Sequence, residues 1–258
     1  MPRQANRPIR VSAGALLATM LAASLAAWPA AAKCGDSAKA GVDWTGCSKP
    51  MLVLSKDDLS GSTLSRAALT STDFTHSKLT GAKLVESELS RTRFDGADLS
   101  GADFRKAVGW RASFAGANLE RANFSSADMS RSLFARARAA GAIFAKSEAN
   151  RSDFTGADLT GADMSKSELA RVVFAGAKLG GVNFSYSNLA RARLAGLDLA
   201  GVNMTGAYLF MTKIEGADLS RTTGLTQAQL ERACGTAGTK LPPGISQPQP
   251  WPCVDEEE

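Results

Sequence analysis

Large apolar residues recur at every fifth position through most of the chain. From Leu54 to Leu219, 34 consecutive positions fall at this step, and 31 of them are Leu, Phe, Met or Ile. The three exceptions are Gly109, Ala139 and Ala149. A period of five fits neither an α-helix nor a flat strand. The pattern therefore predicts a chain built from short structural repeats, each too small to bury its own apolar face.

A second, longer period of twenty residues groups the repeats in fours. One apolar column reads Phe74, Phe94, Phe114, Phe134, Phe154 and Phe174. Glycines keep the same phase at Gly96, Gly116, Gly156, Gly176, Gly196 and Gly216. If four repeats form one coil, residues twenty apart stack directly above one another. At ~4.8 Å per coil, the repeats predict a solenoid of about eight coils, roughly 40 Å long.

Within each repeat, a small residue precedes the apolar centre by two positions, and Asp or Asn often precedes it directly. The stretches FDGADLSGADF, FAGANLERANF and FTGADLTGADM show this clearly. Over about residues 54–221 the chain resembles the pentapeptide-repeat family, whose motif is A(D/N)LXX. The resemblance implies an all-β solenoid, a right-handed quadrilateral β-helix, in which the centre and the small residue point inward. Any function on the solenoid must then lie in its outward residues.

The segments that flank the repeats are expected to close the two ends of the solenoid. An open end exposes unpaired backbone and the apolar interior. Residues 33–53 are interpreted as an N-terminal cap, and residues 222–258 as a C-terminal cap with an acidic tail. In the latter, LTQAQLERACG predicts a short capping helix, with Thr226 and Gln229 forming a capping box. Trp44 and Trp251 are expected to lie over the lumen.

The first 32 residues are typical of a signal peptide. Three arginines precede the apolar stretch VSAGALLATMLAASLAAW, and Ala30 to Ala32 supply the small residues of a cleavage site. A transmembrane anchor is the alternative, because the apolar stretch approaches spanning length. No later segment is apolar enough to span a bilayer. We therefore expect an exported protein, periplasmic or secreted, with no membrane span in the mature chain.

Four cysteines in an exported chain suggest two disulfide bonds. Cys34 and Cys47 precede the repeats, whereas Cys234 and Cys253 follow them. A rigid repeat region would hold the two pairs apart, which predicts Cys34–Cys47 and Cys234–Cys253. A metal site is disfavoured, because the chain has no CxxC spacing and a single histidine, His76.

The strongest outward pattern is a column of six arginines spaced twenty apart: Arg91, Arg111, Arg131, Arg151, Arg171 and Arg191. Lys106, Lys146 and Lys166 occupy the corner that enters the same face, and Glu88, Asp128, Glu148 and Glu168 lie between. One interpretation is a solvated ladder in which the acids neutralise the arginines. Exposed ion pairs of this kind contribute at most about 1 kcal/mol each. The other interpretation is a binding surface whose surplus charge of +5 attracts an anionic partner.

Aromatic residues accompany this face, and small residues interrupt the core. Trp110 lies on the face, where it either contacts a partner or covers an irregularity at Gly109, and Tyr208 and Phe210 mark its far end. Ala139 and Ala149 are ten apart and share one layer of the lumen. Either two phenylalanines fill that layer, or a small cavity remains there.

No catalytic constellation, phosphate loop or cofactor motif is visible, so we expect a non-enzymatic protein without a cofactor. After loss of three arginines with the signal peptide, 27 bases face 25 acids, and four of these acids end the chain. Some relatives of this family mimic DNA and bind topoisomerases. That alternative requires an acidic cytoplasmic rod, and nucleic acid is a disfavoured partner. The sequence favours an exported structural or interaction module whose partner is a protein or an anionic envelope component.

Overall fold

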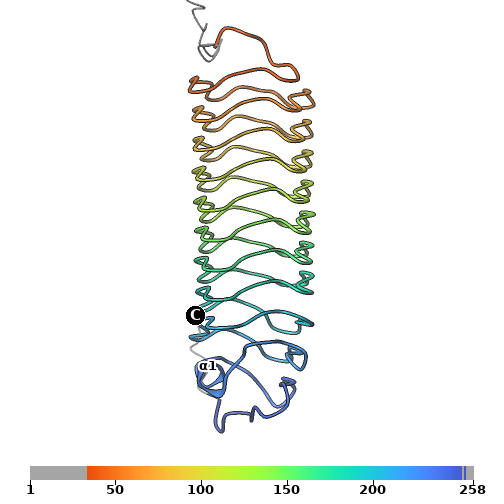
Figure 1. Ribbon diagram of the computed structural model, residues 1–258, viewed down its shortest axis with the longest axis vertical. Coiled ribbons are helices and arrows are strands. Elements are labelled where there is room, and N and C mark those ends of the chain that lie inside the picture. Colours follow the sequence, from red (N-terminus) through yellow and green to blue (C-terminus); the bar gives the residue numbers. More distant parts are fainter. Residues whose placement is uncertain (1–33, 252, 254–258) are drawn as a thin grey trace, which may run out of the picture. The chain divides into compact units, whose positions relative to one another are not determined.

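The computed structural model describes residues 34–251 and residue 253. The predicted signal peptide and the acidic tail at residues 255–258 lie outside the described residues. The described chain winds into coils that follow one another in sequence order (Figure 1). The fold is a repeat β-solenoid.

Parallel backbone pairing between residues twenty apart holds the coils together. Residues directly before the apolar centres pair with their counterparts in the next coil, from Asp43 with Thr63 to Asn203 with Thr223, with one gap at Lys178 and Asp198. In a typical repeat, the Leu99 N–H donates to the Asn118 carbonyl at 2.8 Å. Each side of a coil is so short that these pairs are isolated bridges. A coil thus comprises four pentapeptides, as the twenty-residue period predicts.

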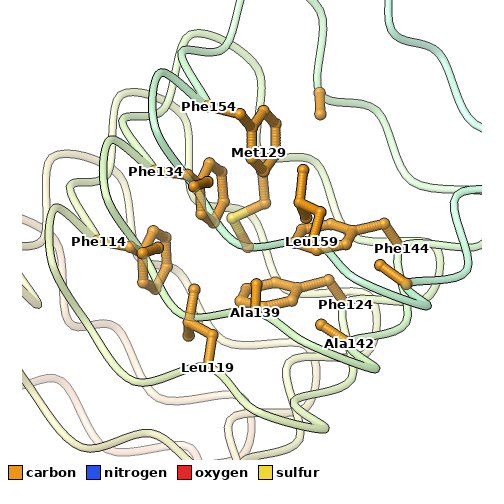
Figure 2. Packing of buried hydrophobic residues seen from close by; sticks show 14 of the residues in the cluster. Phe114, Leu119, Phe124, Met129, Phe134, Ala139, Ala142, Phe144, Phe154 and Leu159 are labelled. Atoms are coloured by element: carbon orange, nitrogen blue, oxygen red, sulfur yellow. The ribbon is translucent and has the colours of Figure 1, made fainter. Parts of the chain in front are cut away.

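The interior consists of stacked apolar columns. Phe94 and Phe114 stack in parallel with their ring centroids 5.0 Å apart, and Phe104 and Phe124 stack at 4.5 Å on the opposite side of the lumen. Rings of the two columns meet edge to face at 5.6–5.9 Å (Figure 2). All of these side chains are fully buried. Such aromatic contacts add about 0.5–1.5 kcal/mol each to the burial itself.

The three small residues in the apolar columns are explained by their neighbours. A Cβ atom at Gly109 would lie 2.6 Å from Sδ of Met129, the centre residue of the next coil in the same column. The Met129 side chain thus fills the space that a larger residue at position 109 would take. Ala139 and Ala149 are fully buried, and Phe134 and Phe144 of the same layer contact edge to face at 5.6 Å. This arrangement supports the interpretation that two phenylalanines fill that layer.

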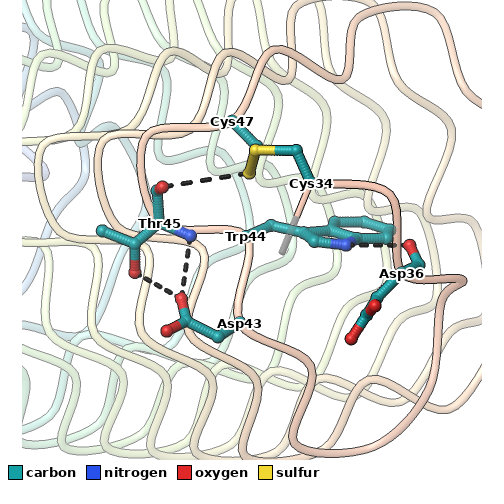
Figure 3. The surroundings of a disulfide bond; sticks show 6 residues. All are labelled: Cys34, Asp36, Asp43, Trp44, Thr45 and Cys47. Carbon is teal, nitrogen blue, oxygen red and sulfur yellow. Dashed lines mark hydrogen bonds between the residues drawn. A yellow bond between two sulfur atoms is a disulfide. The ribbon is translucent and has the colours of Figure 1, made fainter. Parts of the chain in front are cut away.

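Both predicted disulfide bonds are present, Cys34–Cys47 and Cys234–Cys253. At the first end, Trp44 is 1% exposed, and its Nε1 donates to the Asp36 carbonyl at 3.1 Å (Figure 3). Trp44 stands in the position of an apolar centre.

Coil pairing reaches into both flanking segments. It begins at Asp43, within the residues interpreted as the N-terminal cap. At the other end the described residues contain one helix, α1 (Gln227–Leu230), whose N-cap residue Thr226 forms both hydrogen bonds of a capping box with Gln229. After α1 the chain returns to the stack, where Cys234 pairs with Lys213.

Hydrogen bonds at the turns hold several outward aspartates in the ionised state. Asp218 Oδ1 accepts from the Ser220 hydroxyl at 2.6 Å and from its N–H at 3.0 Å, and Oδ2 accepts from Lys240 Nζ at 3.1 Å. The Ser220 hydroxyl makes the largest contribution, and together these donors lower the pKa of Asp218 from 3.8 to about 2. Hydrogen bonds from Thr45 likewise lower the pKa of Asp43.

The lowered aspartate pKa values predict that acid destabilises the fold. Above about pH 4 these carboxylates are ionised in both folded and unfolded chains, so their full contribution to stability is present. As pH falls from 3.8 toward the folded value of about 2 for Asp218, the unfolded chain takes up protons first. Urea unfolding at a series of pH values should show the free energy of unfolding falling across this range. An Asp218→Asn variant should show a shallower fall, and a flat profile in the parent would contradict the prediction.

The packing at Gly109 predicts a compensating pair of substitutions. Gly109→Leu restores the usual residue of the repeat, but its side chain collides with Met129 and should lower the free energy of unfolding by about 1–3 kcal/mol. Shortening the neighbour in a Gly109→Leu, Met129→Ala double variant should recover most of that loss in denaturant unfolding. Equal stabilities of the single and double variants would show that Met129 does not occupy this space.

Candidate functional site

The six arginines form one corner of the solenoid. We call Arg91, Arg111, Arg131, Arg151, Arg171 and Arg191 the arginine column, and the side of the coils that it shares with Lys106, Lys146 and Lys166 the arginine face. Each column residue follows an apolar centre by two positions and has a φ between 58° and 61°. All six side chains are exposed. Coil pairing at a step of twenty therefore aligns them along the stack.

The backbone at these corners is a conformation that glycine adopts most easily. An L-residue in the left-handed region costs roughly 1–2 kcal/mol. At another corner, glycine fills the equivalent positions from Gly41 to Gly201 with Arg121 as the single interruption. The corner of the arginine column contains no glycine between Met51 and Met211. Because the fold accepts glycine at such corners, backbone geometry does not account for the arginines. The absence of glycine from this corner is visible in the sequence at a step of twenty.

The guanidinium groups of the column have no ionic partner in the part of the chain that the structure describes. None of them makes an ion pair or a side-chain hydrogen bond there, whereas arginines elsewhere do, such as Arg105 with Asp103 at 2.7 Å. Two of the four acids on the arginine face bond to other groups. Glu168 Oε2 accepts from Asn188 Nδ2 at 2.8 Å, and Asp128 Oδ1 accepts from the Ser130 N–H at 2.9 Å. The geometry thus gives no pairing of the kind that a neutralised ladder needs.

The lysine corner of the face is partly neutralised. Lys106 Nζ lies 3.5 Å from Glu86 Oε1, an exposed contact in which both side chains are largely solvated. Such a pair contributes little to stability. Glu86 occupies the same corner one coil earlier, and sequence reasoning did not include it.

Trp110 organises part of the arginine column. The Arg111 Cζ lies 4.1 Å from its ring centroid, and the Arg131 Cζ lies 5.9 Å from it. Both distances permit cation–π attraction. Because Met129 already fills the space beside Gly109, the indole is half-buried against arginines rather than in that gap. The structure therefore brings Trp110 together with two of the predicted site residues.

Exposed aromatic side chains gather at the C-terminal end of the arginine face. Tyr208 and Phe210 are 43% and 42% exposed, and their rings are nearly parallel with centroids 6.2 Å apart. Tyr186, which sequence reasoning missed, is 63% exposed on the lysine corner. Its ring lies over Gly206 of the next coil, where an added Cβ would approach it to 2.7 Å. The step of twenty from Lys166 to Tyr186 would have placed it on this face.

Metal-ligand clusters and free thiols were sought among the described residues. These residues contain no group of three or more His, Cys, Asp or Glu side chains placed to hold a metal ion. All four cysteines are joined in disulfide bonds. A separate search of the described residues finds no helix long and apolar enough to cross a membrane.

The family model for pentapeptide repeats matches the chain in eight copies between residues 58 and 223. The chain belongs to the pentapeptide-repeat family. Members of this family are structural and interaction modules. No curated protein matches the chain.

Several solved pentapeptide-repeat structures are similar to this pentapeptide-repeat protein. HetL, involved in heterocyst differentiation regulation in the cyanobacterium Nostoc, is 25% identical, with 79% of this chain and 93% of HetL covered and a TM-score of 0.46. A protein of the Arabidopsis thaliana thylakoid lumen is 26% identical over 48% of this chain and 84% of its own, with a TM-score of 0.34. QnrB1, a plasmid-mediated fluoroquinolone resistance protein, is 20% identical over 75% and 91%, with a TM-score of 0.34. At these TM-scores the likenesses carry no argument about the partner of this chain.

The positive φ at the corners predicts that an arginine of the column can be replaced by glycine without loss of stability. In Arg151→Gly, relief of the left-handed backbone opposes the greater freedom of glycine in the unfolded chain. The free energy of unfolding should therefore change by less than about 1 kcal/mol. Gly101→Ala is the converse control, since an added Cβ there meets no neighbour and should cost about 1 kcal/mol through φ alone. A large loss in Arg151→Gly would mean that the arginine stabilises the fold.

Proposed function

We propose that this pentapeptide-repeat protein is a non-enzymatic, exported structural and interaction module. In this proposal it is a right-handed quadrilateral rod of about eight coils, closed by caps at residues 33–53 and 222–258. Its arginine face receives a protein or an anionic component of the cell envelope.

The single observation that carries the proposal is the unpaired arginine column. Six guanidinium groups are exposed on one corner, none has an ionic partner among the described residues, and glycine would serve the backbone at least as well. Arginine is the side chain best suited to anionic groups, because its planar fork donates two parallel hydrogen bonds to one carboxylate or phosphate. A row of such forks without partners is an arrangement suited to an anionic ligand.

The net positive charge of the arginine face favours attraction of a partner through exposed charges. The nine bases of the face outnumber its acids, which are the four found from the sequence and Glu86. Exposed charges of this kind accelerate association and select partners by complementarity. The same surplus disfavours DNA mimicry, which requires an acidic surface.

Export is supported by the N-terminal sequence and by the two disulfide bonds. Disulfides persist in oxidising compartments and are rare in the cytosol. A partner of the mature protein is then found among envelope or secreted molecules.

Affinity capture from an envelope extract tests the proposal. The mature protein (residues 33–258) is compared with an Arg131→Glu, Arg151→Glu variant, which should lose its partner because attraction becomes repulsion. Arg121→Glu, Arg136→Glu is the matched control, since these exposed arginines have nearly the same φ, 56° and 57°, but stand on other corners. The control should retain the partner.

All three proteins should melt alike before capture is compared. Retention of the partner by the column variant, or equal loss in both variants, would contradict a function located on the arginine column.

A further inference from the structure

We propose that the acidic tail of this chain, residues 255–258, docks on the C-terminal end of the arginine column and competes there with the partner. The tail supplies four carboxylates, Asp255, Glu256, Glu257 and Glu258, and lies outside the described residues. The docking is inferred from where the described chain leads and from charge. Its inhibitory effect rests on the proposed function, because the tail then covers part of the same site.

The disulfide bond Cys234–Cys253 fixes the point from which the tail starts. The Cα atoms of the two cysteines are 5.2 Å apart. Cys234 pairs with Lys213, and Lys213 pairs with Arg193 in the coil before it. Arg191 precedes Arg193 by two positions. The tail therefore starts two coil steps, about 10 Å, from the coil that holds the last arginine of the column.

The length of the tail limits it to the nearest arginines. Five residues, 254–258, follow Cys253, and they span at most about 17 Å when extended. Along the stack, the coil of Arg191 is about 10 Å from Cys234 and that of Arg171 about 14 Å, whereas that of Arg91 is about 34 Å away. The tail thus reaches the last two arginines of the column and cannot reach the first.

The charge beside the column changes along its length. Arg151 stands between Glu148 and Asp153, one on each flanking side of the coil. At the equivalent positions beside Arg191 the chain has Asn188 and a further arginine. The acids that accompany the middle of the column are therefore missing at the end nearest the tail, where a segment with four carboxylates meets its best complement.

The corner beyond the column adds to this positive charge. The Met211 N–H donates to the Arg232 carbonyl at 2.7 Å, which places Arg232 at the same corner in the next turn of the chain, with its side chain exposed. Two acids lie here as well: Glu231 precedes Arg232, and Glu215 Oε1 lies 3.8 Å from Lys213 Nζ. Basic groups still outnumber acids at this end, so the start of the tail lies in a positive region.

The tether makes weak contacts sufficient. Exposed ion pairs contribute little individually. Because Cys253 is bonded to the stack, docking of the tail is intramolecular, and the effective concentration of its carboxylates is in the millimolar range. Such a contact occupies the end of the column without closing it permanently. A partner with stronger charge complementarity displaces the tail.

Modification of arginine by phenylglyoxal, measured residue by residue by mass spectrometry, tests the docking. The mature protein (residues 33–258) is compared with a chain that ends at residue 254. Loss of the tail should raise the modification rate of Arg191 by about threefold or more, as expected when the tail is docked at least two-thirds of the time. The rate at Arg171 should rise less. Arg91, beyond the reach of the tail, and Arg136, on another corner, should react at unchanged rates.

Two controls separate charge from bulk and one copy from two. An Asp255→Asn, Glu256→Gln, Glu257→Gln, Glu258→Gln variant should react like the shortened chain, and about 0.5 M salt should abolish the difference between the parent and the shortened chain. Shielding of Arg191 should persist when the protein is diluted. Equal rates at Arg191 with and without the tail, equal changes at Arg91, shielding by the neutral tail, or shielding lost on dilution would overturn the inference.

The inhibitory effect is measured by affinity capture of the envelope partner. The shortened chain and the neutral-tail variant should retain more partner than the parent at equal protein concentration. Unchanged capture by both chains, with shielding of Arg191 present, would overturn the competition. If Arg191 is not shielded but capture still depends on Arg131 and Arg151, the tail inference fails and the proposed function stands. If Arg191 is shielded but capture does not depend on the column, the proposed function fails and the docking stands.

Discussion

The parallel hydrogen bonds between residues twenty apart are the constraint on which the rest of this structure depends. They tie Asp43 to Thr63 and continue at the same step to Thr223. Because the pairing leaves no room for a shift of one residue, each position in a coil belongs to one column for the length of the stack. Inward positions form the Phe and Leu columns, and outward positions form rows of identical or alternating chemistry. A single arginine in the repeat thus becomes a row of arginines along one corner.

The same constraint decides how the core accommodates exceptions. In a globular core a helix or strand can shift to close a gap. A coil of this solenoid cannot shift in the same way, because its backbone is hydrogen-bonded to the coils on both sides. The gap at Gly109 is therefore filled from the adjacent coil, by Met129. The small pair Ala139 and Ala149 lies in a layer with two phenylalanines in edge-to-face contact. The space left by a small residue is therefore filled by a side chain from the same column or from the same layer.

Much of the fold was predictable because its signal is periodic, and the parts that were not are local. The steps of five and twenty give the coil, the columns and the separation of the two disulfide bonds. They did not give the start of pairing at Asp43, because Lys49 interrupts the run of apolar centres between Trp44 and Leu54. They did not give the return of Cys234 to the stack, because α1 changes the step to 21. On the arginine face, the period placed Arg131 and Trp110 near one another. It could not show that Glu168 bonds to Asn188 instead of an arginine, since that depends on side-chain rotamers.

The corner conformation explains why the outward surface is informative in a protein of this kind. Every corner from Gly41 to Gly216 has a positive φ, so glycine is the residue of least strain at each of them. Any other residue there carries a backbone cost that the coil does not require. The stack tolerates other residues there, as at the lysine corner, where no position from Arg66 to Tyr186 is glycine. Six successive arginines on one corner, with no glycine among them and no ionic partner in the described chain, bear that cost repeatedly. The fold alone does not require them, and a contact of the guanidinium groups with a partner is the reason that we propose.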